Sequence, residues 1–181
     1  MNSIAKLAEG MPVLPLLWEL QANPRLWNAY PHRTADPASP HHQADDIWAR
    51  YAASEDWGKD GPHESVWYDC GSANEPIRVM VRQLMTLVHG TRLGGVLITR
   101  VRAGREVKPH IDQGWHARYY RKIAVQVQSA PGQRFCFEDG PFETKPGDVY
   151  AFDNSVLHWV ENPTEYDRIT LIACIKSEIG D

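Results

Sequence analysis

The sequence has few cysteines, no excess of basic residues and no long apolar run, and each absence excludes a class of protein. Its three cysteines, Cys70, Cys136 and Cys174, are an odd number without the paired spacing of a zinc site or a disulfide framework, so we interpret them as buried free thiols. The 19 basic and 23 acidic residues give a net charge of −4. A long polyanion such as a nucleic acid is therefore not an expected partner.

Targeting and membrane-spanning signals are also missing. No apolar run approaches the length of a membrane span, and the first residues lack an apolar signal core followed by a cleavage site. We therefore expect a cytoplasmic protein without membrane partners. The 181 residues are 43% hydrophobic, which is enough for one sizeable core. The sequence predicts a single domain over residues 1–181.

The hydrophobic pattern divides this domain into two parts. Up to about residue 92 it predicts helices and loops, with a proline-rich loop over 31–40 and an amphipathic helix over 75–89. From about 93 to 176 it predicts eight strands, at about 95–102, 106–112, 121–129, 133–138, 141–145, 148–153, 157–162 and 167–176. Eight strands in this length fit a mainly β fold, a cupin-like jelly roll or double-stranded β-helix, with the N-terminal helices outside it.

Two histidines and an aspartate have the spacing of a metal site. His110 and Asp112 lie two residues apart on an extended segment, so their side chains share a face. His158 follows 46 residues after Asp112, which leaves room for several strands to return beside the first. Two imidazoles and one carboxylate on one face of an ion leave positions open for a co-substrate and dioxygen, as in non-haem Fe(II) sites. His-X-Asp alone arises by chance, but the joint spacing indicates an iron site.

An arginine ten residues beyond His158 indicates the co-substrate. Arg168 lies on an extended segment on which Thr170 shares its face. A guanidinium binds a carboxylate through two parallel hydrogen bonds, and a threonine hydroxyl can add another. The pair fits the distal carboxylate of 2-oxoglutarate.

Other polar and aromatic residues near these motifs are candidates for substrate contact. They are Trp115, His116, Arg118 and Tyr119, which directly follow the first two ligands, and His41 and Arg50 upstream. Aromatic clusters belong to cores as often as to binding sites, so both interpretations stay open for this group. The local cations Arg118, Arg121 and Lys122 suit an anionic small molecule, an amino acid or an acidic protein side chain.

The motifs resemble those of a known family, the aspartyl/asparaginyl β-hydroxylase-like group of Fe(II)/2-oxoglutarate oxygenases, which includes small stand-alone bacterial and phage members. The similar segments are 45–51, 108–112, 114–120, 152–155, His158 and 167–169. The resemblance implies a double-stranded β-helix with His110, Asp112 and His158 as iron ligands and Arg168 as the co-substrate anchor. It further implies hydroxylation of a small molecule or an amino-acid side chain, using Fe(II), 2-oxoglutarate and O2 and releasing succinate and CO2.

The chain departs from the animal members of this group at two positions. They have glycine where this chain has Asp112, so Asp112 is either an iron ligand, which we favour, or a neighbour of a two-histidine site. They also carry an Arg-X-His pair that holds 2-oxoglutarate. The equivalent segment here is Arg121-Lys122-Ile123, which keeps the arginine and has isoleucine in place of the histidine. The resemblance therefore implies a second contact with the co-substrate from Arg121 and none from a histidine.

Two other functions are compatible with a jelly roll that carries these residues. One is a cupin-type metal-dependent isomerase or a small-molecule sensor without oxygenase activity, and the other is a binding domain with a vestigial site. A cupin-type protein does not need the guanidinium of Arg168, so this residue discriminates it from an oxygenase. The intact set of three ligands argues against a vestigial site.

Overall fold

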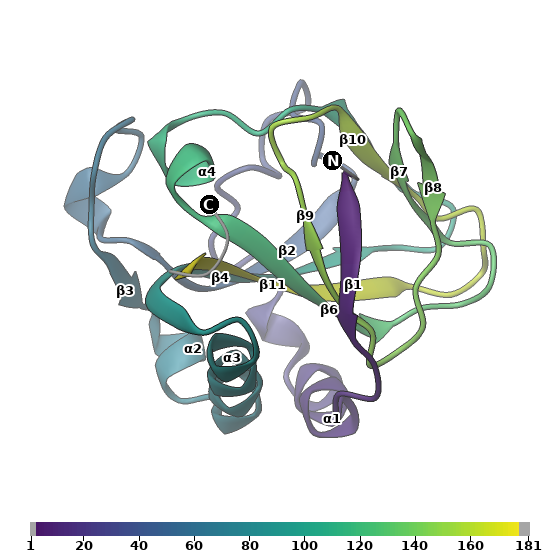
Figure 1. The fold of residues 1–181 in the computed structure, drawn as a ribbon, viewed down its shortest axis with the longest axis horizontal. Helices are drawn as coiled ribbons and strands as arrows, with labels where there is room; N and C mark the ends of the chain where they lie inside the picture. The colour runs from purple at the N-terminus through teal and green to yellow at the C-terminus, as the bar shows by residue number, and fades with distance from the viewer. Residues whose placement is uncertain (1–2, 178–181) are drawn as a thin grey trace.

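The structure is a computed structural model that describes residues 3–177, and two β-sheets make up most of it (Figure 1). Its strands are β1 (Ile4–Ala8), β2 (Ala44–Ala52), β3 (Ser65–Trp67), β4 (Gly90–Val101), β5 (Glu106–His110), β6 (Arg121–Gln128), β7 (Arg134–Phe137), β8 (Gly140–Phe142), β9 (Val149–Phe152), β10 (His158–Glu161) and β11 (Arg168–Ser177). Its helices are α1 (Leu14–Ala22), α2 (Asp69–Ser72), α3 (Glu75–Leu87) and α4 (Trp115–Tyr119), with 3-10 turns η1 (Pro24–Leu26) and η2 (Ser54–Asp56). No helix in this described part has the length and apolar character needed to cross a membrane.

Within residues 3–177 the larger sheet has seven strands in the order β1-β9-β6-β11-β4-β2-β3, and the smaller has four in the order β5-β10-β7-β8. Neighbouring strands run antiparallel in both sheets. The two sheets pack as the predicted double-stranded β-helix, so the fold class is confirmed. The eight predicted strands correspond to β4 through β11, and the helix predicted over 75–89 is α3.

The region before residue 92 differs from the prediction of helices and loops, because it adds three strands to the larger sheet. β1 pairs with β9 at one edge, and β2 pairs with both β4 and β3 at the other. The sequence did not predict β2 because this strand carries two adjacent carboxylates, Asp45 and Asp46, which are buried in the structure. Charged residues are almost never buried without a partner, and the partners of these two come from elsewhere in the chain.

Alternation along the strands gives the larger sheet two different faces. On β11, Ile169 and Leu171 face the helices, whereas Arg168 and Thr170 line the space between the sheets. Figure 1 shows α1 and α3 below the larger sheet, where they cover its outer face. The inner face packs on the smaller sheet through an aromatic core whose buried members are Ala124, Phe135, Phe137, Tyr150 and Phe152.

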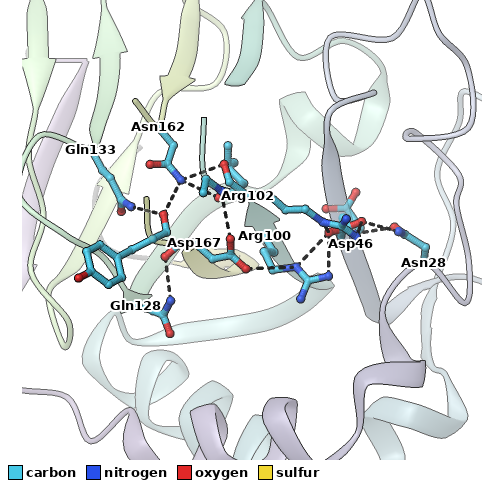
Figure 2. Close-up of polar contacts among 12 residues, drawn as sticks. Asn28, Asp46, Arg100, Arg102, Gln128, Gln133, Asn162 and Asp167 are labelled. Carbon is cyan, nitrogen blue, oxygen red and sulfur yellow. Dashed lines mark hydrogen bonds and ion pairs between the residues drawn. The ribbon is translucent and has the colours of Figure 1, made fainter. Parts of the chain in front are cut away.

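A polar network fixes the chain just before β11 (Figure 2). Gln133 and Asn162 each donate to the carbonyl of Tyr166 at 2.8 Å, and Gln128 donates to the carbonyl of Asp167 at 2.9 Å. The Asp167 carboxylate accepts from the backbone of Ala103 at 3.1 Å. The backbone immediately before Arg168 is therefore held from several strands, which fixes where the Arg168 side chain begins.

The same network neutralises one of the buried carboxylates of β2. Asp45 accepts hydrogen bonds from Asn28 at 2.7 Å and from the guanidinium groups of Arg100 and Arg102 at 2.9 and 2.6 Å. In Figure 2 the labelled side chains of Asn28, Arg100 and Arg102 converge beside Asp46 on β2. The Asp45 carboxylate, which made β2 hard to predict from the sequence, thus links β2 to β4 through its hydrogen bond with Arg100.

Candidate active site

The three predicted ligands come together where β5 and β10 meet. His110 ends β5 and His158 begins β10, and the two are cross-strand partners with ring centroids 4.4 Å apart. Asp112 Oδ1 lies 3.6 Å from His110 Nε2, and Asp112 Oδ2 lies 4.0 Å from His158 Nε2. Two imidazole nitrogens and a carboxylate therefore converge on one point, which is the donor set of a non-haem iron site.

Backbone carbonyls orient both imidazoles. Nδ1 of His110 lies 2.8 Å from the carbonyl of Lys108, and Nδ1 of His158 lies 2.9 Å from that of Val156. A carbonyl only accepts hydrogen bonds, so Nδ1 carries the proton in each ring and Nε2 keeps its lone pair. Metal-binding histidines are held in this way, with the second nitrogen donating to a carbonyl. The residues present therefore fit a divalent ion.

The protonation states agree with that fit. Burial lowers the pKa of His158 to about 4 and also lowers the pKa of His110. Burial alone would raise the pKa of Asp112, but the charge and the hydrogen bond of Lys122 outweigh it and lower that pKa below its ordinary value. At neutral pH the site thus offers two neutral imidazoles and one carboxylate, as a metal ion requires.

β6 begins with two adjacent cations, Arg121 and Lys122, and Lys122 is the one that lies at this site. Its ammonium donates a hydrogen bond to Asp112 Oδ2, and both side chains are largely buried. Arg121 lies on the opposite face of β6 and lines a separate cleft with Leu87 and His89. The structure thus does not support the contact between Arg121 and the co-substrate that the resemblance implied.

A first cleft runs from the two histidines into the space between the sheets. It has about 530 Å³ of space including its open mouth, and both Lys122 and Arg168 line it. Lys122 pairs with Cys174 on β11, six residues along that strand from Arg168. The two cations consequently lie at different ends of the cleft. Its walls between them are largely apolar, with Phe135, Phe152, Val160 and Ile172 among the lining residues.

Among the residues that the structure describes, 3–177, Arg168 is a buried charge without a counter-ion. Its side chain is only 2% exposed, and it donates to Thr144 Oγ1 at 3.0 Å and Tyr150 OH at 3.5 Å. No carboxylate of residues 3–177 forms an ion pair with it. Burial accordingly lowers its pKa. Burying a charge costs several kcal/mol unless it is paired, so this end of the cleft favours an anionic ligand. Thr170 lines the same cleft.

A second cleft, larger in volume, adjoins the ligand Asp112. Asp112 lines it together with three of the predicted substrate residues, Trp115, His116 and Arg118. The His116 ring stacks on His63 with centroids 5.6 Å apart, and burial lowers the pKa of His116 to about 3. The cleft has about 1190 Å³ of space including open solvent, roughly twice that of the first. Of the three metal ligands, Asp112 lines this cleft, whereas His110 and His158 line the first one.

Two of the predicted substrate residues support the walls and line neither cleft. Arg50 donates to the carbonyls of Gly94 and Leu93 at 3.1 and 3.3 Å, so its guanidinium is used within the scaffold. The Tyr119 ring stacks on Trp115 with centroids 4.9 Å apart, and its hydroxyl accepts from Arg92 at 3.3 Å. The structure therefore does not place either residue where it would touch a bound substrate.

His41 lies at the ligand cluster itself. Its ring packs against His110 with centroids 4.5 Å apart, and ligand-type atoms of His41, His110 and Asp112 all lie within 4.8 Å of one another. Burial is the main cause that lowers the pKa of His41 well below its ordinary value, so the ring is neutral. It lines the first cleft, whereas the sequence grouped it with substrate contacts.

Sequence reading missed Arg33, which comes from the proline-rich loop over 31–40. Arg33 lines the first cleft beside His41, and its guanidinium donates to Asp46 at 2.6 and 3.0 Å and to Thr99 at 2.7 Å. The only signal in the sequence is indirect. A carboxylate in a buried strand, such as Asp46, requires a cation from another part of the chain.

Comparison with known proteins gives a family and a fold. The model of the family described as Aspartyl/Asparaginyl beta-hydroxylase matches residues 39–177. A viral collagen prolyl hydroxylase from Paramecium Bursaria Chlorella virus-1, solved as its 2OG complex, aligns with a TM-score of 0.58 at 11% identity over 97% of each chain. No curated protein sequence matches the chain.

Two bacterial structures share the fold at a similar level of structural similarity. An oxidoreductase of the 2OG-Fe(II) oxygenase family from Burkholderia pseudomallei has a TM-score of 0.55 and 15% identity, over 80% of this chain and 74% of that one. A Pseudomonas putida prolyl-4-hydroxylase has a TM-score of 0.53 and 15% identity, over 97% of this chain and 93% of that one. At these identities the likeness is one of fold.

Proposed function

We propose that this chain, which belongs to the aspartyl/asparaginyl β-hydroxylase family, is an Fe(II)- and 2-oxoglutarate-dependent dioxygenase that hydroxylates a small molecule or an amino-acid side chain. The observation that carries the proposal is the guanidinium of Arg168, which has no acidic partner within residues 3–177 and is buried in the same cleft as His110 and His158. An anion of the right length would bind Arg168 at one end and the metal at the other, and 2-oxoglutarate is such an anion.

His110, Asp112 and His158 would hold the ion through two Nε2 atoms and one carboxylate. When bound, Fe(II) couples the decarboxylation of 2-oxoglutarate to succinate and CO2 with transfer of one oxygen atom from O2 to a substrate C–H bond. The protein supplies orientation for this chemistry. The carbonyls of Lys108 and Val156 fix the imidazoles, and Lys122 keeps Asp112 ionised.

Arg168 would bind the distal carboxylate of 2-oxoglutarate through two parallel hydrogen bonds. The hydroxyls of Thr144 and Tyr150, which already contact Arg168, and that of Thr170 lie in reach of the same end of the cleft. The apolar walls exclude water, which strengthens these charge-assisted hydrogen bonds. The substrate would approach through the second cleft, past Trp115, His116 and Arg118.

A cupin-type isomerase or sensor would use the same metal ligands but would leave Arg168 without a role. A buried cation with no acidic partner among the described residues is costly to keep in a site that binds no anion. The oxygenase function accounts for this residue and for the ligands together.

Turnover under air tests the proposal. The protein is incubated with Fe(II), 2-oxoglutarate and pooled amino acids, peptides and acidic metabolites, and succinate is measured together with any gain of one oxygen atom by mass spectrometry. We expect succinate that requires both Fe(II) and 2-oxoglutarate and is lost in His158→Ala. Equal succinate from wild type and His158→Ala would overturn the proposed function, because it would show that the ligand cluster is not used.

A further inference from the structure

His41 differs from the metal ligands His110 and His158 in which ring nitrogen forms a hydrogen bond with the protein. His110 and His158 donate through Nδ1 to backbone carbonyls, which leaves the lone pair of Nε2 for a metal. In His41 the engaged atom is Nε2, which lies 3.3 Å from Nη1 of Arg33. His41 therefore uses its two ring nitrogens in the opposite way to His110 and His158, with Nε2 engaged and Nδ1 left towards other partners.

Arg33 decides which nitrogen of His41 carries the proton. Nε and Nη2 of the guanidinium bind the two oxygens of Asp46, and Nη2 also binds Thr99, so the group has a fixed orientation. A guanidinium only donates hydrogen bonds, and His41 Nε2 must accept this one. In a neutral ring the proton then sits on Nδ1.

That Nδ1–H is a buried donor for which the described residues, 3–177, provide no acceptor. Leaving such a donor unpaired is unfavourable, because on burial it has lost its hydrogen bond to water. The ring also faces a strongly cationic setting, because Arg33 and Lys122 line the same cleft. A donor among cations beside a ligand cluster is suited to a bound anion and unsuited to direct binding of a metal ion.

We infer that His41 binds the carboxylate of the 2-oxo-acid end of the co-substrate through Nδ1–H, with Arg33 as the residue that positions it. The inference rests on the proposed function and extends it. Arg168 would hold one end of the dicarboxylate and His41 the other, beside the metal. The loop over 31–43, outside the jelly-roll strands, thereby contributes a binding residue to the site.

The experiment compares three variants in Mn(II)-loaded protein without oxygen. His41→Ala removes the donor. His41→Asn keeps an N–H donor, because the asparagine amide nitrogen occupies the position of Nδ1. His42→Ala is the matched control, since His42 is the exposed neighbour and its side chain has one hydrogen bond within the described residues, to the carbonyl of Thr34. Calorimetry gives the affinity for Mn(II) first and then for 2-oxoglutarate.

We expect His41→Ala to weaken 2-oxoglutarate binding by at least about tenfold, the size of one hydrogen bond to a charged group. His41→Asn should recover most of this loss, His42→Ala should show none, and Mn(II) affinity should stay unchanged in all three. Unchanged 2-oxoglutarate affinity in His41→Ala would overturn the inference alone. A parallel loss of Mn(II) affinity would overturn it in favour of a metal ligand. Failure of wild type to bind 2-oxoglutarate would instead overturn the proposed function and the inference with it.

Discussion

Arg121 and Lys122 are adjacent in the chain but lie on opposite faces of β6. Lys122 bonds the Asp112 carboxylate at the ligand cluster, whereas Arg121 lines a cleft on the helix side. Because successive side chains on a strand point to opposite faces, only one of these two adjacent cations can face the site. The two residues also supply a matched pair of substitutions.

Lys122→Met should destabilise the metal-free protein, and Arg121→Met should not. Removing Lys122 leaves a buried carboxylate unpaired, which costs about 3–5 kcal/mol in the free energy of unfolding, while an exposed cation contributes less than about 1 kcal/mol. Urea unfolding with a chelator measures both. Because a bound ion restores positive charge beside Asp112, Mn(II) should stabilise Lys122→Met more than wild type. Equal stability of the two variants would show that Lys122 does not compensate Asp112.

Asp112→Gly tests whether the carboxylate is a ligand. The substitution keeps both imidazoles and removes the oxygens that lie 3.6 Å from His110 and 4.0 Å from His158. We expect weaker binding of Fe(II) or Mn(II) and loss of most succinate formation, since a hard anionic oxygen strengthens a site for these ions. Undiminished metal affinity and turnover would place Asp112 beside a two-histidine site.

Arg33→Met should cost about 3–5 kcal/mol of unfolding free energy, because it leaves the fully buried Asp46 carboxylate without its ion pair. Arg82→Met is the control. The ion pair of Arg82 with Glu75 is exposed on both sides, and its loss should cost less than about 1 kcal/mol. A similar small loss in both variants would contradict the view that the Arg33 loop is anchored to the barrel.

Acid should destabilise the metal-free protein through its buried neutral histidines. The pKa of His158 is lowered to about 4 and that of His116 to about 3, both below the ordinary value of 6.5. Between these values the unfolded chain binds more protons than the folded one, so stability is full above pH 6.5 and falls as the pH drops towards 4. Each group contributes at most about 1.4 kcal/mol per pH unit. In urea unfolding between pH 7 and 5, His116→Phe should flatten the decline, and an unchanged slope would show that His116 does not titrate as its burial implies.

The sequence predicted the double-stranded β-helix and its metal ligands because the patterns that indicate them lie within short segments of the chain. The eight strands from β4 to β11 each show their own turn residues, and His110 and Asp112 share a face by alternation alone. Arg168 and Thr170 follow from the same alternation on β11. None of these predictions needs knowledge of which distant segments meet.

The remaining site residues could not be predicted because they depend on distant partners. β6 is apolar on both faces, with Ile123 packed towards the helices and Ala124 towards the aromatic core, so its pattern does not show whether Arg121 or Lys122 faces inward. β2 was missed because the partners of Asp45 and Asp46 come from other segments. Arg33 lies in a proline-rich loop whose composition indicates only the absence of regular structure.

The affinity of the Mn(II)-loaded protein for 2-oxoglutarate, measured without oxygen in wild type and Arg168→Met, tests the oxygenase assignment most directly. If Arg168 pairs with the distal carboxylate, the variant should bind 2-oxoglutarate more weakly by about 2–5 kcal/mol while its Mn(II) affinity is unchanged. Equal 2-oxoglutarate affinity in the two proteins would contradict the assignment, because the buried guanidinium would then have another purpose.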